Sequence, residues 1–116
     1  MENKKDYYVL PNGKTTFEFI KEYLEKGNNG IYNGAIPFTP FDGFLIGNII
    51  KYLARNGKKE NAHDDLEKAK HYAEIYCEDC IPDFPDADDF HKKVIKYLLS
   101  GDLLQAQANF NELIKG

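Results

Sequence analysis

The sequence predicts an all-α domain of about five helices that follows a short extended segment. Apolar residues recur at helical spacing along most of the chain. Threonine, proline and glycine residues stand where these periodic stretches begin or end, as they do at helix boundaries. The 116 residues, 42% of them hydrophobic, have the length and composition of one globular domain spanning 1–116.

The chain begins with an extended segment and a turn. Within residues 6–14, Tyr-Tyr-Val-Leu is followed by Pro-Asn-Gly, a combination typical of a short extended piece that ends in a turn. The first helix is expected over residues 15–24, where Thr15 and Glu18 have the spacing of a capping box. Gly27 is expected to end this helix.

The second helix is preceded by a glycine- and asparagine-rich loop at residues 27–37. Thr39 can cap it, and Pro40 suits its first turn. Its expected buried face comprises Phe41, Phe44, Leu45, Ile49, Tyr52 and Leu53. Gly43 and Gly47 weaken a helix by about 1 kcal/mol each relative to alanine. We therefore expect another helix or a ligand to approach closely at these two glycines.

Three further helices are expected in the second half of the chain. The third covers residues 64–80, the fourth 86–99, and the fifth starts at Asp102 with Gln105 as its capping partner. The expected buried stripe of the third helix is Leu66, Ala69, Ala73, Tyr76, Cys77 and Cys80. The last two helices are predicted to form an antiparallel hairpin over residues 86–116.

Charge and composition exclude several classes of function. The net charge is −4, with nine cations and seven acids in residues 1–60, and six cations and twelve acids in 61–116. This balance disfavours a duplex-DNA binder, which needs a broad basic face. No apolar run approaches the roughly 20 residues of a membrane span. The N-terminus lacks the apolar stretch of a signal peptide, so the expected location is the cytoplasm.

Four cations occur within nine positions of this acidic chain, with no acid among them: Lys51, Arg55, Lys58 and Lys59. Asn48, Lys51 and Arg55 fall on one side of the second helix. Guanidinium and ammonium groups bind phosphate oxygens, and the turn that carries the two further lysines leads into the start of the third helix. The alternative is a solvated helix face followed by a lysine-rich turn.

The acids Asp64 and Asp65 begin the third helix and have two interpretations. They can cap the helix and offset its dipole. Otherwise one of them pairs with Arg55 or Lys51 to orient it, or holds a magnesium ion. Because a dedicated metal site needs more converging carboxylates, we expect no metal site here.

Other chemical motifs are weak. Cys77 and Cys80 form a C-x-x-C, but the three histidines do not complete a zinc site, so both cysteines are expected at buried helix positions. The sequence contains no Walker or Rossmann glycine-rich loop and no evident catalytic triad. No cofactor is expected.

The segment 47–72 resembles a family of small proteins common in bacteriophage genomes and long labelled as of unknown function. The resemblance rests on Gly47-Asn48-Ile49-Ile50-Lys51-Tyr52, Arg55, Gly57-Lys58-Lys59, Asp64-Asp65-Leu66, Lys68-Ala69 and Tyr72. The helix at 15–24 is similar to the family's preceding helix. The family-like core thus covers residues 15–80, and the hairpin at 86–116 lies outside it. The family includes the nucleotide kinase of T-odd coliphages, which works without a Walker motif.

The resemblance implies a phage-derived protein that handles a nucleotide. The first hypothesis is a binder without chemistry, which sequesters a host nucleotide such as a cyclic defence messenger. The alternative is a nucleoside monophosphate kinase, and a second alternative is a protein–protein adaptor that uses the C-terminal hairpin. The expected ligand-binding residues are Asn48, Lys51, Tyr52, Arg55, Lys58, Lys59, Asp65 and Tyr72. Tyr52 or Tyr72 is expected to stack on the base. A homo-oligomer is also expected, because one small domain offers limited concavity. The variant Arg55→Ala is expected to lose binding and keep the fold.

Overall fold

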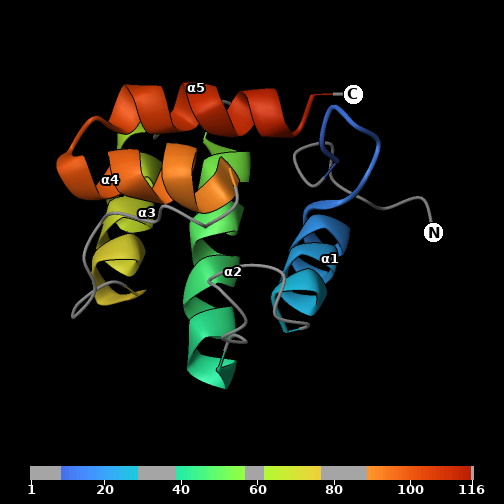
Figure 1. Cartoon of the computed structure of the whole chain (residues 1–116). Coiled ribbons are helices and arrows are strands. Elements are labelled where there is room, and N and C mark those ends of the chain that lie inside the picture. Colours follow the sequence, from blue (N-terminus) through green and yellow to red (C-terminus); the bar gives the residue numbers. More distant parts are fainter. Residues whose placement is uncertain (1–8, 29–38, 57–61, 77–88, 116) are drawn as a thin grey trace.

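A computed structural model describes residues 9–28, 39–56, 62–76 and 89–115 of the chain (Figure 1). These residues form α1 (Thr16–Asn28), α2 (Pro40–Arg55), α3 (Ala62–Tyr76), α4 (Lys96–Ser100) and α5 (Leu103–Leu113). A π-helical segment, η3 (Phe90–Ile95), leads directly into α4. Apart from one antiparallel bridge between Val9 and Thr15, the described residues contain no β-structure. The all-α prediction is confirmed.

The helix α2 stands at the centre of the molecule (Figure 1). It runs antiparallel to α3 and packs against it, while α1 packs on another side of α2. The segment η3–α4 and α5 form the predicted antiparallel hairpin, which lies across one end of α2 and α3. None of the helices in the described ranges is both long and apolar enough to cross a membrane.

The capping box predicted at the start of α1 is present, and Thr39, predicted to cap α2, also forms one. The backbone N–H of Thr15 donates to Glu18 Oε1 at 2.8 Å, and the N–H of Glu18 donates to Thr15 Oγ1 at 3.1 Å. Thr39 and Asp42 exchange the equivalent pair of bonds at the start of α2, both at 3.0 Å. Each box satisfies two N–H groups that the first turn of a helix leaves without partners. These caps fix where α1 and α2 begin.

The predicted end of the first helix and the predicted cap of the fifth helix are wrong. The helix α1 continues through Gly27 to Asn28, because a glycine weakens a helix without having to end it. Asp102 precedes α5 but makes no side-chain cap, and Gln105 instead donates to Asn109 Oδ1 at 2.9 Å. The predicted glycine stop between the last two helices is confirmed, since Gly101 has φ of +88° in the left-handed region.

Several expectations fall on residues that the structure leaves undescribed. The turn after Leu10 is confirmed by the bond from its N–H to the Lys14 carbonyl at 2.8 Å, but residues 1–8 lie outside the described ranges. Most of the predicted loop at 27–37 and both cysteines of the C-x-x-C also lie outside them. The third helix is described as far as Tyr76, with Leu66, Ala69 and Ala73 buried as predicted.

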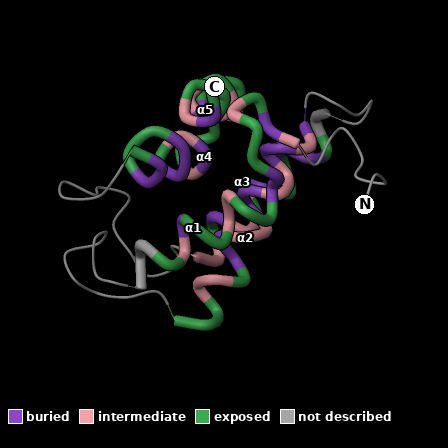
Figure 2. The backbone as a smooth tube through the Cα atoms, turned by 90° about the vertical axis from the view of Figure 1, so that its right-hand side faces the viewer, coloured by how far each residue is buried: buried purple, intermediate pink, exposed green. Residues whose placement is uncertain are grey.

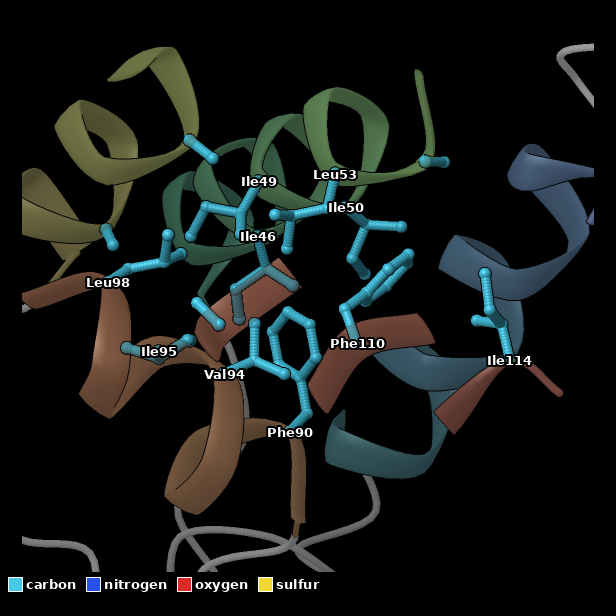
Figure 3. Packing of buried hydrophobic residues seen from close by; sticks show 14 of the residues in the cluster. Ile46, Ile49, Ile50, Leu53, Phe90, Val94, Ile95, Leu98, Phe110 and Ile114 are labelled. Carbon is cyan, nitrogen blue, oxygen red and sulfur yellow. The ribbon is translucent and has the colours of Figure 1, made fainter. Parts of the chain in front are cut away.

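The core lies where α2, α3, η3–α4 and α5 meet. Figure 2 shows that the buried stretches of these helices alternate with exposed ones, as amphipathic helices require. Phe110 of α5 is fully buried, with ring centroids 6.0 Å from Phe19 and 6.5 Å from Phe90. Figure 3 shows Phe90 and Phe110 pointing into a cluster of aliphatic side chains from α2 and η3. This cluster anchors α2, whose other side is available for α1 and for a surface site.

The buried face of α2 differs from the prediction at its start. Buried residues of this helix are Leu45, Ile46, Ile49, Ile50, Leu53 and Ala54. Phe41 and Phe44 were predicted to be buried but are 59% and 56% exposed, and Tyr52 is only partly buried. The first turn of α2, which carries Phe41, extends past the end of α3 (Figure 1), and Phe44 is covered only in part by its contact with Tyr72. Two large aromatic side chains therefore face solvent on this helix.

Gly43 and Gly47 of α2 lie at the contact with α1. The sequence predicted that either a helix or a ligand would approach these glycines, and the neighbour is a helix. A Cβ at Gly43 would lie 3.6 Å from Leu24 Cδ1, and one at Gly47 would lie 3.6 Å from Ile20 Cγ2. Both contacts come from α1, so a helix is the neighbour at these positions. The glycines set the spacing of α1 and α2 and leave the α3 side of α2 for other contacts.

Candidate functional site

The ring of Tyr52 is the centre of a cluster that joins α2 and α3. Lys51 Nζ lies 4.7 Å and Arg55 Cζ 5.7 Å from its centroid, both from α2. Lys68 Nζ approaches the same centroid to 5.5 Å from α3. The ring of Tyr72 stacks on that of Tyr52, with centroids 5.9 Å apart and planes 18° apart. Three cations and two stacked rings thus meet at one place on the surface.

The α3 side of this cluster follows from helical spacing. Asp65, Lys68 and Tyr72 stand at positions i, i+3 and i+7, which places them on one face of α3. Since α3 runs antiparallel to α2, its first turn meets the last turn of α2, where Arg55 lies. Asp65 Oδ1 is 3.6 Å from Arg55 Nη2. The prediction that one of the two acids pairs with Arg55 is confirmed for Asp65, whereas Asp64 is exposed.

The Arg55–Asp65 pair is buried on its acidic side. Asp65 is 1% exposed, whereas the Arg55 side chain remains 32% exposed. The contact is an ion pair longer than a hydrogen bond, and neither Arg55 Nε nor Asp65 Oδ2 has a hydrogen-bond partner within the described structure. The carboxylate therefore orients the guanidinium, and the exposed part of the Arg55 side chain can still offer donors to a second anion.

The magnesium interpretation of these acids gains no support from the described residues. Within the four described ranges, no three His, Cys, Asp or Glu side chains gather as a metal-binding group. The neighbouring cation Lys70 is engaged elsewhere, because its Nζ lies 2.7 Å from Glu74 Oε2. That hydrogen bond raises the pKa of Lys70 above its ordinary value. Lys70 thus forms a surface ion pair with Glu74, whereas Lys68 approaches the ring of Tyr52.

Two further aromatic residues of α2 continue from the cluster toward the start of that helix, and we refer to Phe41, Phe44, Tyr72 and Tyr52 together as the aromatic strip. Phe44 meets Tyr72 edge to face, at 6.0 Å and 76°. Phe41 and Phe44 are nearly parallel, at 6.2 Å and 12°. Flat rings of this kind can stack on a planar heterocycle, while ammonium and guanidinium groups hold phosphate. The combination suits a ligand that is aromatic at one end and anionic at the other.

The remaining predicted site residues have different outcomes. The Nδ2 of Asn48 donates to the Phe44 carbonyl at 2.8 Å, so this amide stabilises α2 in the present arrangement. Lys58 and Lys59 lie outside the described residues. The structure thus brings together Lys51, Tyr52, Arg55, Asp65 and Tyr72 from the predicted set.

Lys68 was missing from the predicted site residues, although it belongs to the motif that carried the family resemblance. Its position three residues after Asp65 and four before Tyr72 was the available signal. Helical spacing places all three on one face of α3. Lys68 could therefore have been predicted from the sequence, because it is the cation at helical spacing from both Asp65 and Tyr72.

A groove elsewhere on the molecule is an alternative place for a ligand. Its volume is about 410 Å³, and its lining contains none of the predicted site residues. Its walls include the buried residues Leu10, Leu53 and Ile114, together with Glu112 and Lys115 of an exposed ion pair at 3.5 Å. This groove lies between the N-terminal turn, the end of α2 and α5. Its walls are suited to an apolar group rather than to phosphate.

The fully buried His91 has a structural position that the sequence did not indicate. The hydroxyl oxygen of Tyr23 in α1 lies 3.0 Å from Nδ1 of His91, and the hydroxyl oxygen of Tyr76 in α3 lies 2.8 Å from its Nε2. A hydroxyl can donate or accept, so it can pair with either nitrogen of the ring. His91 thereby links η3 to α1 and α3. It stabilises the arrangement of these helices and is closed to solvent.

Comparison with known proteins places the central helices in a family. The family described as "Protein of unknown function (DUF3310)" matches residues 16–74, from α1 through nearly all of α3. No curated protein and no solved structure matches the chain. The matched region contains the whole aromatic strip and its cations, whereas the C-terminal hairpin lies outside it. Because the match covers just over half of its residues, this chain belongs to the DUF3310 family of proteins of unknown function.

Proposed function

We propose that this protein binds a phosphorylated nucleotide on the outer face of α2 and α3 and holds it without chemical change. The observation that carries the proposal is the grouping of Lys51, Arg55 and Lys68 around the ring of Tyr52, which stacks on Tyr72. A nucleotide has the matching chemistry, with a flat base joined to a phosphate. The rest of the chain is acidic, so these cations favour a small anion over an extended polyanion.

The phosphate is expected to sit among the three cations. Lys51 and Lys68 lie against the ring of Tyr52, and each exposed cation–π contact of this kind is worth about 0.5–1 kcal/mol. A hydrogen bond to a charged group contributes about 1.5–3 kcal/mol, so both ammonium groups gain by moving from the ring to phosphate. Arg55 is oriented in advance by Asp65, which lowers the cost of ordering its side chain.

The base is expected to stack on the part of the aromatic strip next to the cations. Phe44 is more than half exposed and meets Tyr72 at a steep angle. These two rings form a corner in which a base can stack on one ring and touch the edge of the other. Stacking of this kind tolerates different bases, so the strip favours nucleotides as a class over one particular base.

The biological role that we propose is sequestration of a host nucleotide signal by a phage-type protein. Support comes from the resemblance of segment 47–72 to the phage family that includes a nucleotide kinase. A kinase must bind a phosphate donor and an acceptor together, and its catalysis consists mainly of positioning and charge stabilisation. The same cations would serve that reaction, so the test must measure binding and product together.

The proposal is tested by incubating the full chain with deoxynucleoside monophosphates and with nucleotide signals, each with and without ATP. Thermal unfolding reports binding, since a ligand at 100 times its Kd stabilises the folded state by about 2.7 kcal/mol. Mass spectrometry reports whether the nucleotide is recovered intact. Stabilisation with an unchanged nucleotide supports sequestration. A newly formed diphosphate would establish the kinase, and the absence of stabilisation by any nucleotide would contradict binding.

The variant Lys68→Ala is expected to weaken nucleotide binding about tenfold, since a charged hydrogen bond to phosphate is lost. Lys68 is exposed, so the free energy of unfolding should change little. Isothermal titration calorimetry measures the affinity. The matched control is Lys96→Ala, which removes an exposed cation from α4 and should leave affinity unchanged. Equal affinities for the two variants would place the phosphate elsewhere.

A further inference from the structure

The aromatic strip contains two separate stacking platforms. Tyr52 and Tyr72 form one nearly parallel pair, at 18°. Phe41 and Phe44 form another, at 12°. The two pairs are turned relative to each other, because Phe44 meets Tyr72 at 76°. A single base at the Tyr72–Phe44 corner does not use Phe41, so this ring is left over in a complex with a mononucleotide.

The second platform consists of two phenylalanine side chains that are unusually exposed for large apolar residues. Phe41 is 59% and Phe44 56% exposed, both on the first turns of a helix whose later turns are buried. Large apolar side chains that lie together at the surface mark interaction sites more often than scattered ones do. The strip extends along α2 from Phe41 to Tyr52, eleven residue steps or about 16 Å along the helix axis. Neighbouring bases in a stacked strand are only roughly 3.4 Å apart, so there is room for a second base.

Charge is distributed unequally between the two platforms. Lys51, Arg55 and Lys68 all approach the ring of Tyr52, at the tyrosine end of the strip. At the phenylalanine end, the carboxylate of Asp42 accepts a hydrogen bond from the backbone N–H of Thr39 at 3.0 Å and caps the helix. The tyrosine end therefore favours a phosphate and the phenylalanine end an uncharged planar ring.

From these contacts we infer that the preferred ligand is a dinucleotide, two nucleobases joined through phosphate. This inference rests on the proposed nucleotide binding and narrows its ligand class. The phosphates lie among the cations around Tyr52, one base stacks at the Tyr72–Phe44 corner, and the other stacks on Phe41. Linear and cyclic dinucleotides share this chemistry, and both belong in the experiment.

Isothermal titration of the full chain tests the inference with three kinds of probe: the mononucleotides AMP and GMP, the linear dinucleotides pApA and pGpG, and the two matching cyclic dinucleotides. At least one dinucleotide is expected to bind about tenfold more tightly than its mononucleotide, which is the gain from stacking one more base. Phe41→Ala should remove most of that gain and leave mononucleotide affinity unchanged. Phe17→Ala is the matched control, because Phe17 is an exposed phenylalanine on α1.

Different results overturn the inference and the proposed function separately. Equal affinities for mononucleotides and dinucleotides would overturn the dinucleotide inference and leave nucleotide binding intact. The same holds if Phe41→Ala weakens both kinds of ligand alike, or no more than Phe17→Ala does. Failure of every probe to bind would overturn the proposed function as well. A preference between pApA or pGpG and the cyclic forms identifies which dinucleotide class the strip takes.

Discussion

Replacing Phe110 with alanine is expected to lower the free energy of unfolding by about 3–5 kcal/mol. Phe110 is fully buried where α5 meets the other helices, and its ring lies against Phe19 and Phe90. Removing the ring loses its transfer free energy and leaves a cavity that the surrounding helices fill only partly. Since a domain has only about 5–15 kcal/mol of total stability, this one change removes a large fraction. Urea denaturation followed by circular dichroism measures the loss.

The matched control is Leu104→Ala on the same helix. Leu104 is 78% exposed, so its removal should change stability by no more than about 0.5 kcal/mol. If Phe110→Ala were as stable as Leu104→Ala, the packing of α5 in Figure 3 would be incorrect. The contrast tests the position of the C-terminal hairpin, which lies outside the family match.

The second large effect is expected at the Arg55–Asp65 pair. Arg55→Ala leaves the carboxylate of Asp65 buried without its partner, which should cost about 3 kcal/mol of stability. The sequence alone predicted that this variant would keep its fold and lose only binding. The burial of Asp65 changes that expectation, because the two residues are coupled. Thermal and urea unfolding of the purified variant give the size of the loss.

A second substitution shows how much of the lost stability comes from the unpaired charge of Asp65 and how much from the lost packing of the Arg55 side chain. Arg55→Ala combined with Asp65→Asn removes the buried charge and should recover part of the lost stability. The control Lys51→Ala removes a partly exposed cation that has no buried partner in the described structure, and should cost little. If Arg55→Ala and Lys51→Ala were equally stable, Asp65 would not depend on Arg55. Binding by Arg55 variants should be measured under conditions in which each variant is folded.

Local chemistry made much of the fold predictable from the sequence. The capping boxes at Thr15 and Thr39 use groups three residues apart, so their partners can be identified without knowing the fold. The left-handed glycine at Gly101 is local in the same way. Gly43 and Gly47 predicted a close neighbour, but only the structure identifies that neighbour as α1.

Long-range packing decided what the sequence could not predict. Helical periodicity could not show that Phe41 and Phe44 stay more than half exposed, because this depends on how far the neighbouring helices cover the start of α2. Likewise, the tyrosines that contact His91 stand 68 and 15 residues away along the chain. The site was predictable on each helix separately. The meeting of Lys68 with Tyr52 requires the relative placement of α2 and α3.

Two-dimensional ¹H–¹⁵N NMR of the labelled full chain, titrated with the nucleotide that stabilises it most, tests the central claim most directly. The binding site proposed on α2 and α3 predicts that the largest changes in amide chemical shift occur at Tyr52, Lys68 and Tyr72. These changes should follow one saturating curve. The contradictory result is a set of shifts at Leu10 and Ile114, around the 410 Å³ groove, with Lys68 and Tyr72 unmoved.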